Sequence, residues 1–221
     1  MVHKKSIITL MLVSLLVFSM TGCCQSITLL NEEEARKMST VPAAWLVYWD
    51  MEAGLKDAKK VNGKLDDLVF FAANFDAEGN LVCNKELLTA HKQLKKNKYN
   101  QFLSIVNDVT NGAETVALKD PQTVLTILQD EAIQQKHIAA LLELVKQGGF
   151  NGLEIDYENI WKNDVAVELF PNFVEKLYAA TKQEGLKLRI VLEPSAPMKK
   201  MKFVTGPEYV VMFYNLYGLH S

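Results

Sequence analysis

A short acidic segment constrains the fold of this chain more than any other feature. Residues 149–158 read GFNGLEIDYE, and three carboxylic residues alternate there with apolar or aromatic ones: Glu154, Asp156 and Glu158 with Leu153, Ile155 and Tyr157. On a β-strand alternate side chains share a face, so the carboxyl groups would line up with Cα atoms about 6.5–7 Å apart. Like charges so arranged oppose folding. A chain tolerates that cost more readily where a shared proton and a raised carboxyl pKa are useful.

The position of this segment in the chain favours a buried strand. Acidic residues that alternate along a strand most often mark only a solvated face. Here, however, the segment directly follows a long helical pattern, which is the position of a parallel strand in a βαβ unit. Parallel strands are usually buried on both faces, so a row of carboxyl groups on one is not ordinary solvation. A purely structural acidic strand remains the alternative.

Composition bounds the class of protein and its partners. The chain has 221 residues, of which 49% are hydrophobic, and a net charge of −2. This is long enough for one globular domain with a sizeable core. The near-neutral charge gives no electrostatic case for binding nucleic acid. No His/Cys pattern with metal-ligand spacing and no phosphate-binding glycine loop is present, so we predict neither a metal nor a cofactor.

The N-terminus has the pattern of an export signal. Lys4 and Lys5 precede an apolar run from residue 7 to 20, too short for a stable membrane span. The next residues, Met20-Thr21-Gly22-Cys23, resemble the bacterial lipobox, in which the cysteine is lipidated and becomes the new N-terminus. We therefore expect a lipoprotein signal peptide over 1–22, a lipid anchor at Cys23 that holds the protein to a bacterial membrane outside the cytoplasm, and a polar tether over 23–41. Ordinary secretion is the alternative.

The rest of the chain alternates strand-like and helix-like patterns. Asn84 and Asp120-Pro121 have the residue types of helix N-caps and first helical positions. Six strands are predicted, over residues 44–51, 65–75, 99–107, 149–158, 186–192 and 208–216. An open doubly wound sheet and a (β/α)₈ barrel both fit this α/β pattern, and a barrel normally needs about 250 residues and eight strands. We expect residues 42–221 to form an incomplete (β/α)₈ TIM-type barrel, truncated before strands seven and eight.

Three segments resemble glycoside hydrolase family 18, which contains the chitinases and endo-β-N-acetylglucosaminidases. GFNGLEIDYE is similar to the family's signature at barrel strand four. WLVYWD at Trp45–Asp50 resembles strand one of the spore-cortex and peptidoglycan-directed members. VVMFYNLYG at Val210–Gly218 resembles strand six, where Met-x-Tyr-Asp is common. The resemblance runs from about residue 44 to the end of the chain.

The resemblance implies a role for each matching residue. Glu158 would be the general acid that protonates the glycosidic oxygen, and Asp156 would orient the 2-acetamido group of the substrate. Tyr214 would hydrogen-bond the acetamido oxygen, with Asn215 helping to position that group. Glu154 would lie deeper and modulate Asp156. Catalytic residues belong at the carboxyl ends of barrel strands, and Glu158 is the last carboxyl of its strand.

Further residues are candidates for substrate binding. Met212 belongs to the strand-six motif. Trp49 and Tyr48 follow strand one, and Trp161 lies in the loop after strand four, where aromatic faces would suit the apolar faces of sugar rings. For each aromatic residue a place in the core is a serious alternative. His91 and His137 lie in helical patterns without a partner at ligand spacing, so we expect ordinary surface or half-buried residues.

The resemblance implies a retaining glycosidase that cleaves β-linked glycans containing N-acetylglucosamine by substrate-assisted catalysis. Two departures from the family pattern leave a second reading open, because Glu154 replaces an Asp or Asn and Asn215 replaces the common Asp. That reading is a non-catalytic carbohydrate-binding lipoprotein on the same scaffold. Retention of Glu158 argues for the enzyme. The sequence does not choose between chitin, peptidoglycan and N-linked glycans.

Overall fold

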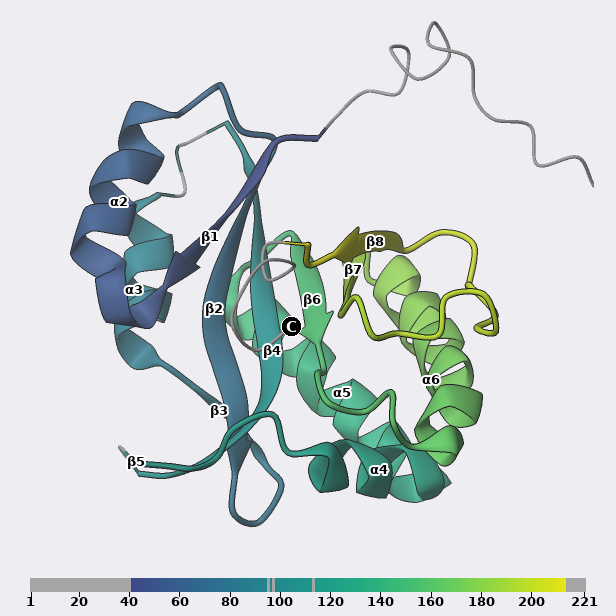
Figure 1. Cartoon of the computed structure of the whole chain (residues 1–221). Helices are drawn as coiled ribbons and strands as arrows, with labels where there is room; N and C mark the ends of the chain where they lie inside the picture. The colour runs from purple at the N-terminus through teal and green to yellow at the C-terminus, as the bar shows by residue number, and fades with distance from the viewer. Residues whose placement is uncertain (1–40, 95, 97, 113, 214–221) are drawn as a thin grey trace, which may run out of the picture. The chain divides into compact units, whose positions relative to one another are not determined.

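A curved parallel sheet forms the centre of the molecule (Figure 1). The computed structural model describes residues 41–213 except 95, 97 and 113. Six strands pair in parallel in the order in which they occur along the chain, which is the order of a (β/α)₈ barrel opened between two strands. The strands are β1 (Ala43–Val47), β2 (Asp67–Asp76), β4 (Asn100–Asn111), β6 (Gly152–Asp156), β7 (Lys187–Leu192) and β8 (Glu208–Val211). The predicted incomplete barrel is therefore confirmed.

Helices cover the outer face of this sheet. Several of them pack directly against strands, for example α3 against β2 and α6 against β7 (Figure 1). The helical elements are η1 (Tyr48–Asp50), α2 (Met51–Lys60), α3 (Lys85–Gln93), α4 (Pro121–Gln129), α5 (Glu131–Gly148) and α6 (Asp164–Gln183). Asn84 caps α3 and Asp120 caps α4 through side-chain oxygens that accept backbone N–H groups, as predicted.

The hydrophobic core lies between the sheet and these helices. Alternate residues of each strand point outward into it, and they include Phe70 of β2, Ile105 of β4, Ile155 of β6 and Ile190 of β7, all fully buried. Tyr157 continues this face beyond β6, where it stacks with Phe173 of α6. The apolar half of the acidic segment is thus core, as the alternation predicts.

The inner face of the sheet is unusually polar. Strand register places Ser104, Glu154, Arg189 and Glu208 side by side on β4, β6, β7 and β8. Arg189 is 1% exposed, and its Nη2 lies 2.5 Å from Oδ2 of Asp67 on β2 and 2.8 Å from Oε2 of Glu208. Because β2 and β7 are not neighbours in the sheet, the ion pair between Arg189 and Asp67 spans the concave interior and helps to hold the sheet curved.

Several expectations about single elements are corrected by the structure. Strand β1 ends at Val47, and the next three residues form the turn η1, because the chain must bend there to enter α2. Two short antiparallel strands were not predicted, β3 (Leu81–Cys83) beside β2 and β5 (Glu114–Ala117) beside β4. His91 and His137 are 1% and 6% exposed, so the expectation of surface or half-buried residues was wrong.

Candidate active site

The carboxyl groups of the acidic segment lie on the inner face of the sheet and at its carboxyl edge. All five residues of β6 are buried, which confirms that the strand is covered on both faces. Glu154 and Asp156 are on the concave side, and Glu158 follows two residues after the strand ends. Active sites of parallel barrels occupy this edge, where loops that follow the strands meet.

Glu154 is the deepest of the three carboxyl groups. Its Oε1 accepts a hydrogen bond of 2.9 Å from Nε1 of Trp45 on β1, and its Oε2 lies 3.6 Å from Nη1 of Arg189. Burial raises the pKa of Glu154, while the hydrogen bond from Trp45, the nearby hydroxyl of Ser104 and the Arg189 charge act in the opposite direction. Glu154 is one methylene longer than the Asp or Asn common at this position in the family. Residues of β1, β4 and β7 surround the longer side chain.

Asp156 is buried and incompletely paired. It is 5% exposed, and its Oδ1 has no hydrogen-bond partner among the described residues. Burial raises the pKa of Asp156 to about 8; the Lys119 charge lowers it, and the neighbouring carboxylates of Glu158 and Glu154 raise it further. A carboxyl oxygen that is buried without a partner is an open position for a hydrogen bond from a ligand.

Glu158 is fixed at the mouth of the site through its backbone. The side chain of Asn107, fully buried on β4, accepts a hydrogen bond from the Glu158 N–H and donates one to the Glu158 carbonyl, both of 2.9 Å. The side chain of Glu158 is half-buried and its Oε1 lies 2.5 Å from Nζ of Lys119. The acid is thus held by the neighbouring strand and faces a cation.

Lys119 was not predicted as a site residue. Its backbone is in the left-handed region with φ of 52°, and its N–H donates to Oδ1 of Asp108 over 2.8 Å. Burial alone would lower the pKa of the Lys119 ammonium, but the carboxylates of Asp156, Glu158 and Asp108 raise it above its ordinary value. In the sequence, one feature alone indicates that Lys119 lies at the carboxyl edge of β4: it directly precedes the helix cap Asp120.

Solved structures with a similar fold share this architecture. A class V chitinase from Pseudomonas fluorescens Pf-5 is 20% identical with a TM-score of 0.67, and the match covers 81% of this chain and 56% of that one. The spore cortex-lytic enzyme SleL of Bacillus cereus is 21% identical with a TM-score of 0.58, over 70% of this chain and 35% of that one. A class V chitinase from Nicotiana tobaccum in complex with NAG4 is 15% identical with a TM-score of 0.61, over 81% and 54%.

These matches decide the architecture. The fold is that of the chitinases. At such identities the likeness extends to the fold, and the chain spans about a third to just over half of the length of these structures. No protein-family model and no curated protein matches the sequence.

Exposed aromatic rings are linked to the acid through two intervening residues in this chitinase-like fold. Trp49 is 65% exposed and makes edge contacts with Tyr48 and with Phe71 of β2. Nζ of Lys119 lies 5.4 Å from the centre of the Phe71 ring. Contacts therefore run from Trp49 through Phe71 and Lys119 to Glu158, which places the two predicted aromatic residues near the mouth.

Trp161 has a different environment from the one predicted for a sugar platform. It is 7% exposed and packs edge-on against Phe170 of α6. The loop after Glu158 folds back onto the helices, so this ring is part of the hydrophobic core. The prediction of sugar stacking by Trp161 is corrected in favour of the core alternative.

The remaining predicted residues lie at or beyond the last described strand. Met212 is half-buried, and its N–H donates to the carbonyl of Leu192 over 3.0 Å, which extends the β7–β8 pairing. Tyr214 and Asn215 lie outside the described residues, as does Cys23. Glu193, directly after β7, accepts a 2.7 Å hydrogen bond from the N–H of Asn159, the residue after Glu158.

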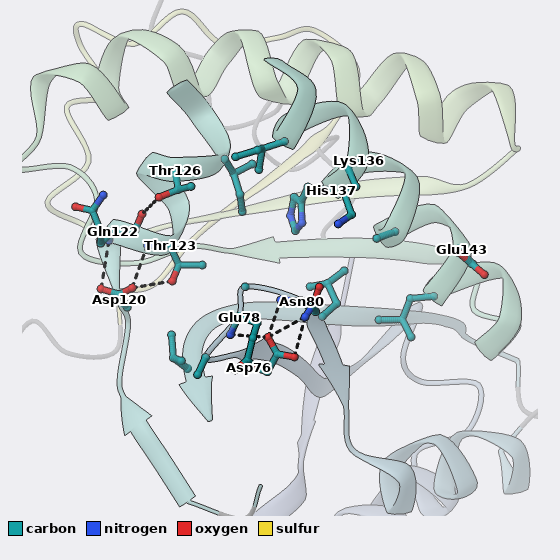
Figure 2. Close-up of a pocket in the computed structure, with 18 of the residues that line it drawn as sticks. Asp76, Glu78, Asn80, Asp120, Gln122, Thr123, Thr126, Lys136, His137 and Glu143 are labelled. Carbon is teal, nitrogen blue, oxygen red and sulfur yellow. Dashed lines mark hydrogen bonds between the residues drawn. The ribbon is translucent and has the colours of Figure 1, made fainter. Parts of the chain in front are cut away.

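A cavity of about 700 Å³ lies elsewhere in the chitinase-like fold. Figure 2 shows Asp76, Glu78 and Asn80 from the turn between β2 and β3 on one wall, opposite residues of α4 and α5. His137 lines it, and its Nε2 lies 2.7 Å from the hydroxyl of Tyr157. The three carboxyl groups of the acidic segment do not line this cavity.

Two further features are absent from the described part of the chain. Within residues 41–213, apart from the three omitted positions, no group of three or more His, Cys, Asp or Glu side chains is arranged to hold a metal ion. In the same region no helix is both long and apolar enough to cross a bilayer.

Proposed function

We propose that this protein is a retaining glycoside hydrolase that cleaves β-linked glycans containing N-acetylglucosamine. The observation that carries the proposal is Asp156, a buried carboxyl group with one oxygen unpaired among the described residues, two residues before the half-buried Glu158. In substrate-assisted hydrolysis the acetamido oxygen of the sugar is the nucleophile. Such a site needs one proton donor and one group that steers the acetamide, which is what this pair offers.

The reaction would proceed in two steps. Glu158 donates a proton to the glycosidic oxygen as the bond to the anomeric carbon breaks and the acetamido oxygen bonds to that carbon, giving a cyclic oxazolinium. Asp156 accepts a hydrogen bond from the acetamido N–H and stabilises the positive charge. Glu158 then takes a proton from water, which attacks the anomeric carbon and reopens the ring with net retention. Tyr214 and Asn215 would complete the acetamide contacts.

The aromatic surface at the mouth supports a carbohydrate substrate. Trp49 and Tyr48 are exposed beside Phe71, and flat apolar rings suit the apolar faces of pyranoses. One structure of similar fold is a chitinase in complex with NAG4. We take an N-acetylglucosamine oligomer as the first substrate to test.

The Glu158→Gln variant of the full chain tests the proposal. It keeps the size of the side chain but has no acidic proton, so hydrolysis of an N-acetylglucosamine tetramer, followed by mass spectrometry, should fall by about 10²-fold or more. The thermal melting temperature should stay close to that of the wild type. Glu175→Gln, at an exposed position on α6, is the matched control and should retain activity. Equal activity of wild type and Glu158→Gln would overturn the assignment.

A non-catalytic carbohydrate-binding protein is the second candidate. The ion pair between Lys119 and Glu158 favours it, because a paired carboxylate is not a ready proton donor. Calorimetry distinguishes the two functions. Binding of the tetramer without any product would support this candidate, whereas neither binding nor product would exclude both.

We further propose that Cys23 is lipidated and anchors the protein to a bacterial membrane outside the cytoplasm. The support is the Met20–Cys23 motif after a basic and apolar N-terminus. In bacteria that express the full chain, the wild type should partition into the detergent phase of Triton X-114, and Cys23→Ser should not. Partition of both forms into the aqueous phase would contradict the anchor and support ordinary secretion.

A further inference from the structure

We propose that the amino edge of the sheet, where the parallel strands begin, is a surface that binds anionic phospholipid membranes and leaves the candidate active site facing away from the bilayer. The inference goes beyond the proposed hydrolysis and does not depend on it. Six residues, the amino-edge lysines, make up this surface: Lys59, Lys64, Lys96, Lys98, Lys182 and Lys187.

The topology brings the amino-edge lysines to one end of the molecule. Lys64 lies in the loop that leads into β2, and Lys96 and Lys98 lie in the loop that leads into its neighbour β4. The N–H of Lys98 donates a 2.8 Å hydrogen bond to the side chain of Asn62, which joins the two loops. Lys187 is the first residue of β7. Because these strands are parallel, all of these positions lie at the edge opposite the candidate active site.

The lysines at this edge are in excess over the acids. All six are exposed, and none of them forms an ion pair with another described residue. Two acids of the same edge are already neutralised. Asp57 is paired with Lys60 over 2.8 Å. Glu184 is paired with Lys146 over 2.8 Å. Asp66 is a further exposed acid there. The edge therefore carries positive charge, although the net charge of the whole chain is −2.

Helix dipoles explain part of this asymmetry. Cations are stabilised in the last turn of a helix, and Lys59 and Lys182 occupy the last turns of α2 and α6. The other four amino-edge lysines lie outside the helices, where this effect has fallen off. An excess of unpaired lysines in the loops of one edge creates a positive potential that attracts anionic surfaces.

The carboxyl edge has the opposite charge. It contains the candidate active site with Asp156 and Glu158. The helices begin at this edge, and acids occupy their first turns: Glu52, Glu86, Glu131 and Asp164. An anionic bilayer attracts the amino edge and repels the carboxyl edge, so it orients the domain with the candidate active site outward.

The chain enters the fold at the basic edge. Val41 is the first described residue, and β1 begins at Ala43, beside the start of β2. The proposed lipid anchor at Cys23 is therefore joined to the domain at this end. The residues between Cys23 and Val41 can span at most about 60 Å. That reach is about twice the length of α6, so the linker alone does not decide which edge meets the bilayer. Because the anchor is joined on the side of the lysines, we assign the surface to a membrane and not to a soluble polyanion.

Vesicle binding by the full chain tests the inference. Flotation compares vesicles of phosphatidylcholine alone with vesicles of phosphatidylcholine and phosphatidylglycerol in equal parts. A lysine near an anionic bilayer typically strengthens binding about fivefold, so the wild type should prefer the phosphatidylglycerol vesicles by about 10²-fold or more. Most of this preference should disappear in about 1 M salt, where the Debye length falls to about 3 Å. A wild type without a preference for phosphatidylglycerol would overturn the inference.

A triple variant removes one charge from each of three loops or strand starts. Lys64→Gln/Lys98→Gln/Lys187→Gln should lose at least about tenfold of the preference for phosphatidylglycerol. All variants share the N-terminal segment, so differences between them come from the substituted lysines. The corresponding triple arginine variant keeps the positive charge and should bind like the wild type. An unchanged preference in the glutamine variant would refute the role of these lysines.

A second triple variant is the matched control. Lys85→Gln/Lys136→Gln/Lys162→Gln changes the net charge equally, at exposed positions in the first two turns of α3 and α5 and in the loop after β6. It should keep the wild-type preference. Equal losses in both glutamine variants would show that net charge alone matters and would overturn the inference. Binding of soluble polyphosphate without binding to either vesicle would overturn the assignment to a membrane.

Acetylation of lysines tests the orientation directly. On phosphatidylglycerol vesicles the amino-edge lysines should be protected from an amine-acetylating reagent, as mass spectrometry of the digested protein would show, while Lys85 and Lys162 should stay reactive. Protection of Lys85 and Lys162 in place of the amino-edge lysines would overturn the proposed orientation. Neither experiment measures hydrolysis, so an inactive wild type would refute the proposed function without touching this inference.

Discussion

Arg189 shows at the scale of one residue how this sheet tolerates a polar interior. Its guanidinium is 1% exposed and contacts Asp67, Glu208 and, at 3.6 Å, Glu154. It also lies 4.5 Å above the ring of Phe102. Buried carboxylates without a counter-charge would be far more costly than this cluster. One residue thus neutralises charges that come from three strands.

Replacing Arg189 with Met should strongly destabilise the protein. The change removes the cation but leaves Asp67 and Glu154 buried, and breaking a buried ion pair in this way typically costs about 3–5 kcal/mol. Unfolding in urea, followed by circular dichroism, measures the loss. Lys187→Met on the same strand is the control, because Lys187 is exposed and should change stability little. A loss no larger than that of the control would show that the cluster contributes nothing.

At the same scale, the sequence predicted the acids of the candidate site better than their partners. Glu154, Asp156 and Glu158 share a short segment, and strand periodicity alone places the first two on one face. Lys119 and Asn107 come from other segments. The parallel register of β4 with β6 brings Asn107 to Glu158, and the antiparallel return of β5 along β4 brings Lys119 there. Neither has a local pattern that distinguishes it from an ordinary loop lysine or strand asparagine.

At the scale of the element, β6 depends on the glycine at its start. A Cβ atom on Gly152 would lie 2.4 Å from the Phe102 ring and 3.0 Å from the carbonyl oxygen of Lys187. The absence of a side chain lets Phe102 lie against β6, where Arg189 covers its other side. The glycine of the acidic segment is thus explained by the close approach of β4 and β7.

Gly152→Ala should therefore destabilise the sheet. Overpacking of a well-packed interior costs about 1–3 kcal/mol, and the backbone of β7 cannot rotate away as a side chain can. Gly54→Ala in α2 offers a contrast, since its nearest neighbour is a Leu46 side-chain atom at 3.2 Å and alanine favours helix by about 1 kcal/mol. Urea unfolding should show a clear loss for the first variant and little or none for the second. Equal effects would contradict the packing argument.

Elements with strong local signals were predicted well, and those set by tertiary contacts were not. The caps Asn84 and Asp120 carry their own hydrogen bonds, so the starts of α3 and α4 follow from the sequence. The apolar run after Ala44 reads as strand to residue 51, yet it turns at Val47 because α2 packs back on β1. The short strands β3 and β5 exist only as partners of the extended ends of β2 and β4, and periodicity cannot reveal such pairing.

At the scale of the whole molecule, two buried groups make the free energy of unfolding depend on pH in opposite directions. His137 is buried, and burial lowers its pKa to about 4 from 6.5. Between these values the unfolded chain binds a proton that the folded protein does not, so His137 makes stability fall as the pH falls from about 6.5 to about 4. Asp156, with its pKa raised to about 8 from 3.8, has the opposite sign. Its contribution is full below pH 3.8 and is lost as the pH rises to about 8.

Asp156→Asn should remove the second of these effects. Asparagine has no proton to lose, so the stability of the variant relative to the wild type should increase steadily from about pH 4 to about pH 8. Each unit of pKa difference that folding maintains is worth about 1.4 kcal/mol, so even part of the shift gives a slope that urea titrations at several pH values can resolve. Glu175→Gln removes an exposed carboxyl group instead and should run parallel to the wild type. A constant difference between Asp156→Asn and the wild type across this range would mean that Asp156 is already ionised at pH 4 in the folded protein, and burial would then not raise its pKa.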